Sequence, residues 1–365
     1  MKFVCAQQEL MDTLNIVSRA AASKSTLSVI QNIYFEARNN EIYICCYNLE
    51  MGISKVILAQ IKEKGSAIIP IRLCDIVKKL SGDMVEIDCD DKYIISIKSG
   101  FSEFKLIGTS AEEFPELPAI NADYSINIDQ GKLKSMIAQT AFAISTNDQR
   151  PVCTGALFEV EEGILKMVTV DGYRLAIRKE HIVCDINCSF IVPGKTLSEL
   201  QKILADTNKE DVIINAAKNN IIFSVGGYSI ISRLLTGEFI NYKSAIAGEY
   251  IYETAVSTSE IIRSTERISL MINETFKIPV RCVFTDENIT LSCDTPIGKA
   301  EDVISSRGNC DGIDMSFNSK YMLDAFRAVD TDEMKILIRE KCKSVKILPP
   351  EGDSFLFILM PIGRR

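Results

Sequence analysis

The order of hydrophobic and polar positions repeats three times along the chain. Each repeat opens with a short apolar strand, passes a polar cap and enters an amphipathic helix, and the openings 3–10, 126–133 and 254–261 align with one another. Apolar or small positions in these helices follow i, i+4, i+7 spacing, at Leu10, Leu14 and Val17, at Leu133, Ile137 and Ala141, and at Ile261, Thr265 and Ile268. One stripe of each helix therefore faces a core. Self-similarity of this kind indicates repeated structural units.

The rest of each unit repeats as well. After the first helix the pattern predicts a hairpin, a second helix and then further strands. The hairpins open near 33, 156 and 282, their second strands begin near 42, 165 and 289, and the later strands cover 85–88, 212–215 and 334–338, each followed by two more. Alternating strands with two helices per unit predict the α+β class, with three tandem domains rich in short antiparallel strands. Two short linkers set the expected domains at 1–121, 122–248 and 249–365.

The distribution of charge along the chain indicates a possible polyanionic partner. The net charge of the chain is −8. The six expected helical segments nevertheless carry about +6 between them, which leaves about −14 for the remainder; they are 7–24, 72–81, 132–140, 195–204, 260–267 and 320–327. If these helices share one face, that face attracts a polyanion, although an uneven spread of charge by chance is the alternative. The helices lack clustered base-reading side chains and an aromatic platform, so contacts with DNA would be to its backbone, without sequence preference.

Composition narrows the class of protein further. No run of eighteen apolar residues occurs, and the opening M-K-F-V-C-A-Q-Q-E has no apolar signal core, so we expect a cytoplasmic protein. The twelve cysteines are scattered, which favours small buried hydrophobes in a reducing compartment. His181, Cys184 and Cys188 have irregular spacing and no nearby fourth ligand, so a plain loop and strand is favoured over a metal site.

One polar cluster raises the question of catalysis. The stretch V-T-V-D-G-Y-R-L-A-I-R-K, residues 168–179, places Asp171, Tyr173 and Arg174 around a glycine. A reaction centre would need a nucleophile or a paired acid and base nearby, and the only histidine of the chain is His181. Asp-Gly between apolar runs is a strong hairpin signal. We therefore expect a hairpin bend at Asp171-Gly172, with Tyr173, Arg174 and Leu175 exposed just beyond it.

Several short motifs in order resemble one family over the whole chain. They are the opening Met-Lys-Phe, Asn48-Leu-Glu-Met, Phe114-Pro, Thr169-Val-Asp-Gly-Tyr-Arg-Leu, Val192-Pro-Gly-Lys and the ending Leu359-Met-Pro-Ile. Each motif is weak alone, but together they resemble the bacterial sliding clamps, the beta subunits of DNA polymerase III. The resemblance implies a head-to-tail homodimer whose six domains form a ring around duplex DNA, with helices lining the hole. It implies no catalytic residues and no cofactor, and the chain has no G-x-x-x-x-G-K-[ST] nucleotide-binding motif.

The resemblance also implies three sets of site residues. Contacts with DNA fall on Lys24, Arg72, Gln149 and Lys195. Contacts between subunits fall on Lys98, Phe104, Lys105, Leu106, Leu270, Met271, Glu301 and Asp302, with Lys98 and Lys105 facing the two acids. A groove for short peptides of partner proteins falls on Arg150, Cys153, Thr169, Gly172, Tyr173, Arg174, Leu175, Ile240, Ala245, Ser344, Ile358, Met360, Pro361 and Ile362.

The chain departs from the family pattern in a few places. Ile240 stands where a proline is common, Ser244 where an arginine is common, and the chain ends Gly363-Arg-Arg instead of Arg-Leu. Some relatives carry a basic side chain where this chain has Phe101 and Glu103, so apolar packing would matter more at the subunit interface. The groove should therefore have a different rim, and the basic tail should favour acidic flanks on a partner.

The expected partners are double-stranded DNA, a second copy of the chain, the replicative polymerase, the clamp loader and other proteins with a short clamp-binding peptide. Two other hypotheses remain at this point. One is a monomeric, sequence-independent DNA-binding module with the same repeats, and the other is an enzyme that uses the loop at Asp171–Arg174.

Overall fold

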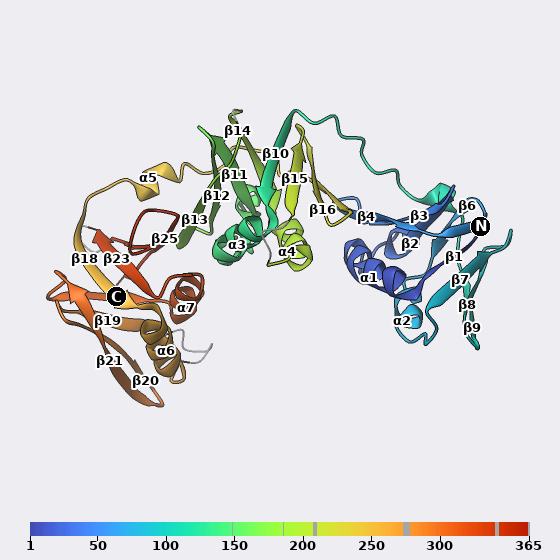
Figure 1. Cartoon of the computed structure of the whole chain (residues 1–365). Coiled ribbons are helices and arrows are strands. Elements are labelled where there is room, and N and C mark those ends of the chain that lie inside the picture. The colour runs from blue at the N-terminus through green and yellow to red at the C-terminus, as the bar shows by residue number, and fades with distance from the viewer. Residues whose placement is uncertain (148, 185, 207–209, 273–277, 340–342, 364–365) are drawn as a thin grey trace. The chain divides into compact units, whose positions relative to one another are not determined.

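The computed structural model describes residues 1–365 apart from 148, 185, 207–209, 273–277, 340–342 and 364–365 (Figure 1). The chain forms two compact units. The first contains residues 1–131 and 202–234, and the second contains 132–201 and 235–365. We refer to them as the first and second units and describe each by itself.

The first unit holds two antiparallel sheets, with strand orders β5-β1-β7-β8-β9 and β10-β15-β16-β17-β4-β3-β2-β6. Its elements are β1 (Lys2–Ala6), α1 (Gln7–Val17), β2 (Ile33–Arg38), β3 (Glu41–Tyr47), β4 (Met51–Leu58), β5 (Gln60–Glu63), β6 (Gly65–Ile69), α2 (Leu73–Val77), β7 (Met84–Cys89), β8 (Ile94–Ser99), β9 (Ser102–Ile107), β10 (Tyr124–Asp129), β15 (Asp211–Ala216), β16 (Asn220–Val225) and β17 (Tyr228–Arg233). The helices α3 (Gln130–Thr140) and α4 (Gly194–Ile203) each span a boundary between the units.

The second unit is built on one sheet, with strand order β14-β11-β12-β13-β25-β24-β23-β18-β21-β20-β19-β22. Its elements are β11 (Gly155–Glu161), β12 (Ile164–Val170), β13 (Arg174–His181), β14 (Cys188–Pro193), α5 (Lys243–Ile246), β18 (Tyr250–Ser257), α6 (Thr258–Ser269), β19 (Val280–Phe284), β20 (Asn288–Thr295), β21 (Gly298–Gly308), β22 (Ile313–Phe317), α7 (Ser319–Arg327), β23 (Glu333–Arg339), β24 (Val345–Leu348) and β25 (Phe355–Leu359). Strand β13 pairs with β25, so a hairpin from the middle of the chain adjoins its last strand.

The expected apolar stripes lie in the cores. Leu10, Leu14 and Val17 are buried on α1, and Ile261, Thr265 and Ile268 are buried on α6. The hydroxyl of Thr265 donates to the carbonyl of Ile261 over 2.7 Å, which satisfies this buried polar group within its own helix. On α3, Leu133 and Ile137 are buried, whereas Ala141 begins a 3₁₀ turn after the helix.

Two expected helices are shorter than predicted. The segment 7–24 is helical only over α1 and one 3₁₀ turn to Ala20, and 72–81 contains only the five residues of α2. Five basic residues of those segments consequently lie outside the α-helices: Arg19, Lys24, Arg72, Lys78 and Lys79. Within the observed bounds of α1, α2, α3, α4, α6 and α7, the net charge falls from about +6 to about +1. The helices themselves are thus nearly neutral, and the excess of positive charge lies at helix ends and in neighbouring loops.

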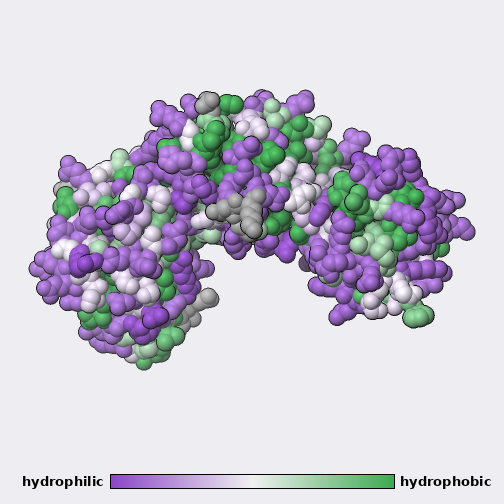
Figure 2. Space-filling view, in the orientation of Figure 1, coloured by the Kyte–Doolittle hydropathy of each residue, from purple (hydrophilic) through white to green (hydrophobic). Residues whose placement is uncertain are grey.

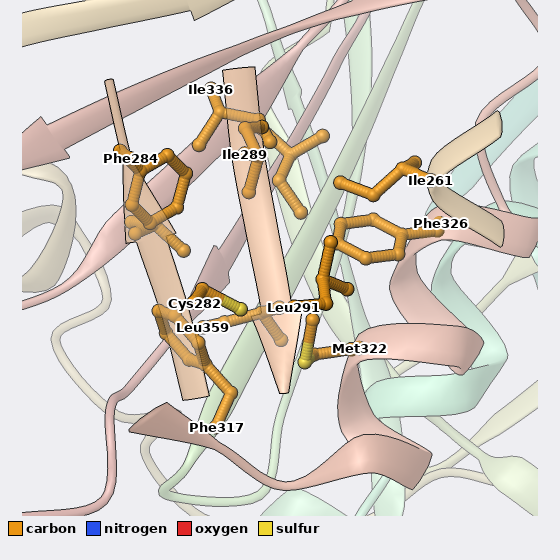
Figure 3. Close-up of a pocket in the computed structure, with 12 residues that line it drawn as sticks. Ile261, Cys282, Phe284, Ile289, Leu291, Phe317, Met322, Phe326, Ile336 and Leu359 are labelled. Atoms are coloured by element: carbon orange, nitrogen blue, oxygen red, sulfur yellow. The ribbon is translucent and has the colours of Figure 1, made fainter. Parts of the chain in front are cut away.

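The core of the second unit packs α6 and α7 against the sheet. A small enclosed cavity of about 20 Å³ lies in it, lined only by apolar side chains and Cys282. Figure 3 shows these side chains pointing toward one another, with Ile261, Met322 and Phe326 on the helix side and Leu359 from β25 among them. An apolar cavity of this size stays dry and offers no polar group to orient a ligand. We therefore assign it to packing.

The cysteines are mostly interior. Nine of the eleven free cysteines in the described part of the chain are buried, and Cys74 and Cys184 are partly exposed. Burial raises the pKa of the Cys5 thiol and of the Cys45 thiol to about 12 in each case, so both stay protonated and unreactive near neutral pH. Among the described residues, no three His, Cys, Asp or Glu side chains are grouped as a metal site would require. None of the described helices is long and apolar enough to cross a membrane.

Candidate functional site

The hairpin of β12 and β13 is present, and its bend lies one residue later than expected. Val170 faces Leu175 in the register, and the backbone N–H of Asp171 donates to the carbonyl of Arg174 over 3.2 Å. Gly172 and Tyr173 are therefore the two central residues of the turn. Gly172 has a φ of +95°, which favours glycine. The Oδ1 atom of Asp171 accepts hydrogen bonds from the backbone of Tyr173 and Arg174 over 2.9 and 3.0 Å.

The expectation that three residues beyond the bend are exposed was wrong for two of them. Tyr173 is 63% exposed, but Arg174 is only 9% exposed and Leu175 only 3%. The reason is that β13 is not an edge strand of the sheet. It pairs on its other side with β25, and successive side chains of β13 then enter the two opposite faces of the sheet.

One face takes Arg174 into a set of charged and aromatic partners. Its Nε atom donates to Oδ2 of Asp171 over 2.9 Å, and its Nη1 atom donates to Oδ2 of Asp324 on α7 over 2.6 Å. The guanidinium also lies 4.3 Å from the ring centre of Tyr321 and 5.4 Å from that of Phe142. Paired carboxylates and aromatic faces together satisfy a buried arginine. This arrangement fixes the hairpin to α7 and engages the carboxylates of Asp171 and Asp324 with Arg174.

The sequence had not indicated Tyr321 and Asp324 as neighbours of the hairpin. They stand three residues apart on α7 and so share one side of that helix. The ring of Tyr321 lies 6.1 Å from that of Tyr173, centre to centre. Their i, i+3 spacing was the only signal in the sequence, and it did not identify the hairpin as their partner.

The other face of β13 and β25 forms an apolar cluster. Leu175 faces Ile358 and Ile177 faces Leu356 across the two strands. With them pack the buried side chains of Leu157, Val168, Ile191 and Tyr242. Six partly buried apolar residues cover this cluster: Val152, Val170, Leu235, Phe239, Ile246 and Leu348. We refer to the buried and partly buried residues together as the apolar cluster.

The last residues of the chain are bonded both to this hairpin and to strand β22. The backbone N–H of Met360 donates to the carbonyl of Tyr173 over 2.9 Å, and that of Ile362 donates to the carbonyl of Ser316 over 2.8 Å. Met360 is 45% exposed and Ile362 is 41% exposed, with Pro361 partly buried between them. Tyr173 and Met360, each two residues from a member of the apolar cluster, therefore present apolar surface to solvent, as does Ile362 beside β22.

The remaining expected groove residues fall into two groups. Cys153, Thr169 and Ser344 are buried. The hydroxyl of Thr169 donates to the carbonyl of Thr140 over 2.6 Å, whereas the buried Ser344 hydroxyl has no partner in the part of the chain that is described. Arg150, Gly172 and Ala245 are exposed, and Ile240 is partly exposed. The short helix α5 directs Ile246 onto the apolar cluster, a residue that the motifs had not indicated.

The four residues expected to meet DNA are all exposed. Lys24 and Arg72 belong to the first unit, and Gln149 and Lys195 to the second. The guanidinium of Arg72 lies 3.4 Å from the carboxylate of Asp75, with both side chains more than 70% exposed. Such an exposed pair is weak and easily exchanged for a phosphate.

Five of the eight residues expected at a subunit interface lie on strands β9 and β21, whereas Lys98 lies on β8 and Leu270 and Met271 follow α6. In the first unit, β9 is the outermost strand of its sheet, and it carries Phe104, Lys105 and Leu106 beside the exposed Ile107. In the second unit, the first eight residues of β21 pair with β20, while only 306–308 pair with β18. Unpaired edges with exposed apolar side chains are templates for a further strand.

Two of the four charged residues expected at the interface, Lys98 and Asp302, are engaged within the chain. The Nζ atom of Lys98 lies 3.6 Å from a carboxylate oxygen of Glu103. Asp302 accepts from Nε of Arg267 over 2.9 Å, and Glu301 is exposed. Leu270 is 82% exposed and Met271 is partly buried. Phe101, directly before β9, is fully exposed and adds hydrophobic surface at this edge.

Comparisons with known proteins agree over the whole chain. Three family models match in order: the N-terminal domain of the DNA polymerase III beta subunit over 1–118, the central domain over 127–241 and the C-terminal domain over 243–363. The beta sliding clamp of Staphylococcus epidermidis is 32% identical over 374 residues, and that of Staphylococcus aureus is 32% identical over 375 residues. In each comparison 99% of both chains is covered.

Solved structures give the same result. The DNA polymerase sliding clamp of Bacillus subtilis has a TM-score of 0.96 at 30% identity, and a putative DNA polymerase III beta subunit of Eubacterium rectale has 0.95 at 30% identity, each with complete coverage of both chains. The fold therefore consists of three clamp domains with helices and antiparallel sheets. The chain belongs to the family of DNA polymerase III beta subunits, which confirms the resemblance inferred from its motifs.

Proposed function

We propose that this protein is a DNA sliding clamp, which encircles duplex DNA and tethers the replicative polymerase to its template. The observation that carries the proposal is the full-length match to three successive clamp domains, together with near-complete coverage by the relatives named beta sliding clamp. The protein acts without catalysis, as a processivity factor. Its place is the cytoplasm, where the chromosome of a bacterial cell is replicated. Its domains extend over about 1–121, 122–248 and 249–365, although the family model for the third begins at 243 and so includes α5.

The ring is a head-to-tail homodimer in this proposal. The edge of β9 on one copy meets the edge of β21 on the other, and Phe104 and Leu106 pack against Leu270 and Met271. The exposed apolar side chains at both edges support this pairing. A head-to-tail contact repeats until the rotation closes, and two copies of three similar domains close as a six-domain ring.

Contacts with DNA are few and made to phosphates. Lys24, Arg72, Gln149 and Lys195 supply them, and their exposure supports this assignment. Topology rather than affinity then holds the ring on DNA, which suits a protein that must slide. A net charge of −8 fits this weak, salt-dependent attraction better than tight binding.

Partner proteins dock a short linear peptide on the second unit. The peptide lies beside the hairpin turn and the C-terminal residues, where Tyr173, Met360 and Ile362 are exposed next to the apolar cluster. An apolar anchor side chain of the peptide contacts Ile240 and Met360, which are accessible at the rim of the apolar cluster. Hydrophobic anchors in largely preformed sites carry most of the affinity of such complexes. The polymerase catalytic subunit and the clamp loader are the expected partners.

A primer-extension assay tests the function. Synthesis by the cognate polymerase on a primed circular template should give much longer products when this protein and a clamp loader with ATP are added. Removal of the loader should abolish the gain, because a closed ring cannot thread onto a circle. Product lengths that are the same with and without this protein contradict the proposal.

A further inference from the structure

Two cations lie on the same outer face of the sheet as the apolar cluster. Arg339 ends β23 and faces Tyr250 of β18, while Lys346 in β24 faces Leu337 of β23. The Nζ atom of Lys346 lies 4.0 Å from the ring centre of Tyr250. The pKa of Lys346 is lowered, first by burial and then by the charge of Arg339, so the two cations are close enough to repel each other.

The guanidinium of Arg339 is held against the backbone of the connector that crosses this face. A Cβ atom on Gly248 would lie only 2.6 Å from its Cζ atom, and Gly248 has a φ of +135°. This φ favours glycine at position 248. The guanidinium of Arg339 therefore lies directly against the backbone of Gly248.

Neither cation has a carboxylate partner within the described residues. Among the described residues of the second unit, Lys335 pairs with Glu253 at 4.0 Å on the same face, whereas no ion pair involves Arg339 or Lys346. The hydroxyl of Tyr250 is also buried without a hydrogen-bond partner in this part of the structure. Within the described part of the chain, these two neighbouring cations therefore share a face that supplies them with no carboxylate, although the net charge of the protein is −8.

These cations continue the proposed docking surface. Lys346 faces Ile358 in the register of β24 and β25, so both side chains point to the same face. Leu348, two residues further along β24, packs on the apolar cluster. Neighbouring strands lie about 4.8 Å apart. Lys346 is on β24, the strand next to β25, and Arg339 is on β23, one strand further from the residues that would hold a hydrophobic anchor.

We propose that Arg339 and Lys346 form a carboxylate-binding subsite that extends the peptide-docking surface. It selects partner peptides that carry Asp or Glu close to their apolar anchor. This inference rests on the proposed docking function. A carboxylate is the anion that a linear peptide presents without modification, and it fits a pair of cations beside an apolar surface.

The test compares matched synthetic peptides by fluorescence anisotropy at low and at physiological salt. Each peptide carries a Leu-Phe anchor, with Glu, Gln or phosphoserine placed one or two residues before or after it. The best Glu peptide should bind the wild-type protein about fivefold more tightly than its Gln counterpart, as expected for two partly exposed ion pairs. In the Lys346→Gln and Arg339→Gln variants this advantage should shrink toward unity, with binding of the Gln peptide unchanged.

The Lys335→Gln variant is the matched control, because Lys335 lies on the same strand and face but is paired with Glu253. It should keep the full preference for Glu. Equal binding of all Glu and Gln peptides to the wild-type protein overturns the subsite, as does a preference that survives both variants. A Lys346-dependent preference shown only by phosphoserine peptides overturns the choice of a carboxylate. Failure of every peptide to bind overturns the docking surface itself, and with it the subsite.

Discussion

Arg174 donates from Nη1 to Oδ2 of Asp324 over 2.6 Å and thereby joins the hairpin of β12 and β13 to helix α7. The arginine is almost fully buried, and Asp324 is 27% exposed. A charge held this way needs its partner, because removal of one member leaves the other desolvated and unpaired. The contact also explains why a loop that resembles a catalytic cluster in the sequence is a structural junction.

The Asp324→Asn variant should lower the stability of the second unit. The substitution keeps the size of the side chain but removes its charge, and a hydrogen bond to a charged group contributes about 1.5–3 kcal/mol. Chemical denaturation followed by circular dichroism measures the loss. The control is Asp294→Asn, whose partner Lys299 is 78% exposed and whose loss should cost less than about 0.5 kcal/mol. Equal effects of the two substitutions would show that the Arg174 junction is not stabilising.

Removal of residues 360–365 should abolish peptide binding and leave the dimer intact. The deletion removes exposed Met360 and Ile362 together with the hydrogen bond from Met360 to Tyr173. The expected subunit contacts lie elsewhere, on β9 and β21. Peptide titration and native mass spectrometry on the same sample measure both properties. A shorter deletion of residues 363–365 is the control and should retain binding, whereas unchanged affinity after the longer deletion contradicts the assignment of the docking surface.

A charge introduced on the β9 edge should separate the subunits. Phe104→Asp places a carboxylate where the proposal packs two apolar surfaces, and burial of an unpaired charge is costly. Native mass spectrometry should then find the 40.6 kDa chain instead of a species of twice that mass. Val183→Asp changes a fully exposed apolar residue far from both edges in sequence and should leave the dimer unchanged. Dimers that persist in the Phe104 variant would place the interface elsewhere.

Substitution of lysines that are expected to contact DNA should weaken DNA binding without changing its sequence preference. The double substitution of Lys24 and Lys195 by alanine removes two phosphate contacts, so the slope of log affinity against log salt should become shallower by about two. Electrophoretic mobility shifts over a salt series on two unrelated duplexes measure this slope. Lys218→Ala, at another exposed lysine, is the control. An unchanged slope in the double variant contradicts the assignment of these two residues.

The local pattern predicted the fold better than the site. Alternating and helical periodicity indicated the repeated strands and helices because each domain buries one stripe or face of every element. The pairing of β13 with β25 joins residues more than 170 positions apart, and no local pattern specifies it. The exposure of Arg174 and Leu175 was mispredicted for this reason. Family motifs indicated the hairpin and the C-terminus, but Tyr321, Asp324 and Ile246 required the three-dimensional arrangement.

The net charge of the helices was also predicted wrongly from the sequence. Helix ends are the least certain part of a prediction from sequence, and five basic residues at those ends accounted for most of the expected basic character. The inference of a DNA-binding protein therefore depends on the family match more than on helix charge. These five basic residues lie beyond the ends of the α-helices, but they are exposed and can still contact the phosphates of DNA.

The central claim is that this protein holds DNA by encircling it, and retention on DNA circles tests this most directly. The labelled protein is loaded onto nicked circular DNA with a clamp loader and ATP, passed through a gel-filtration column at high salt, and recovered before or after a single restriction cut. Two chains of 40.6 kDa should remain with the uncut circle and leave once it is linear. Equal retention on circular and linear DNA, or loss from both at high salt, would contradict the account and favour an ordinary DNA-binding protein.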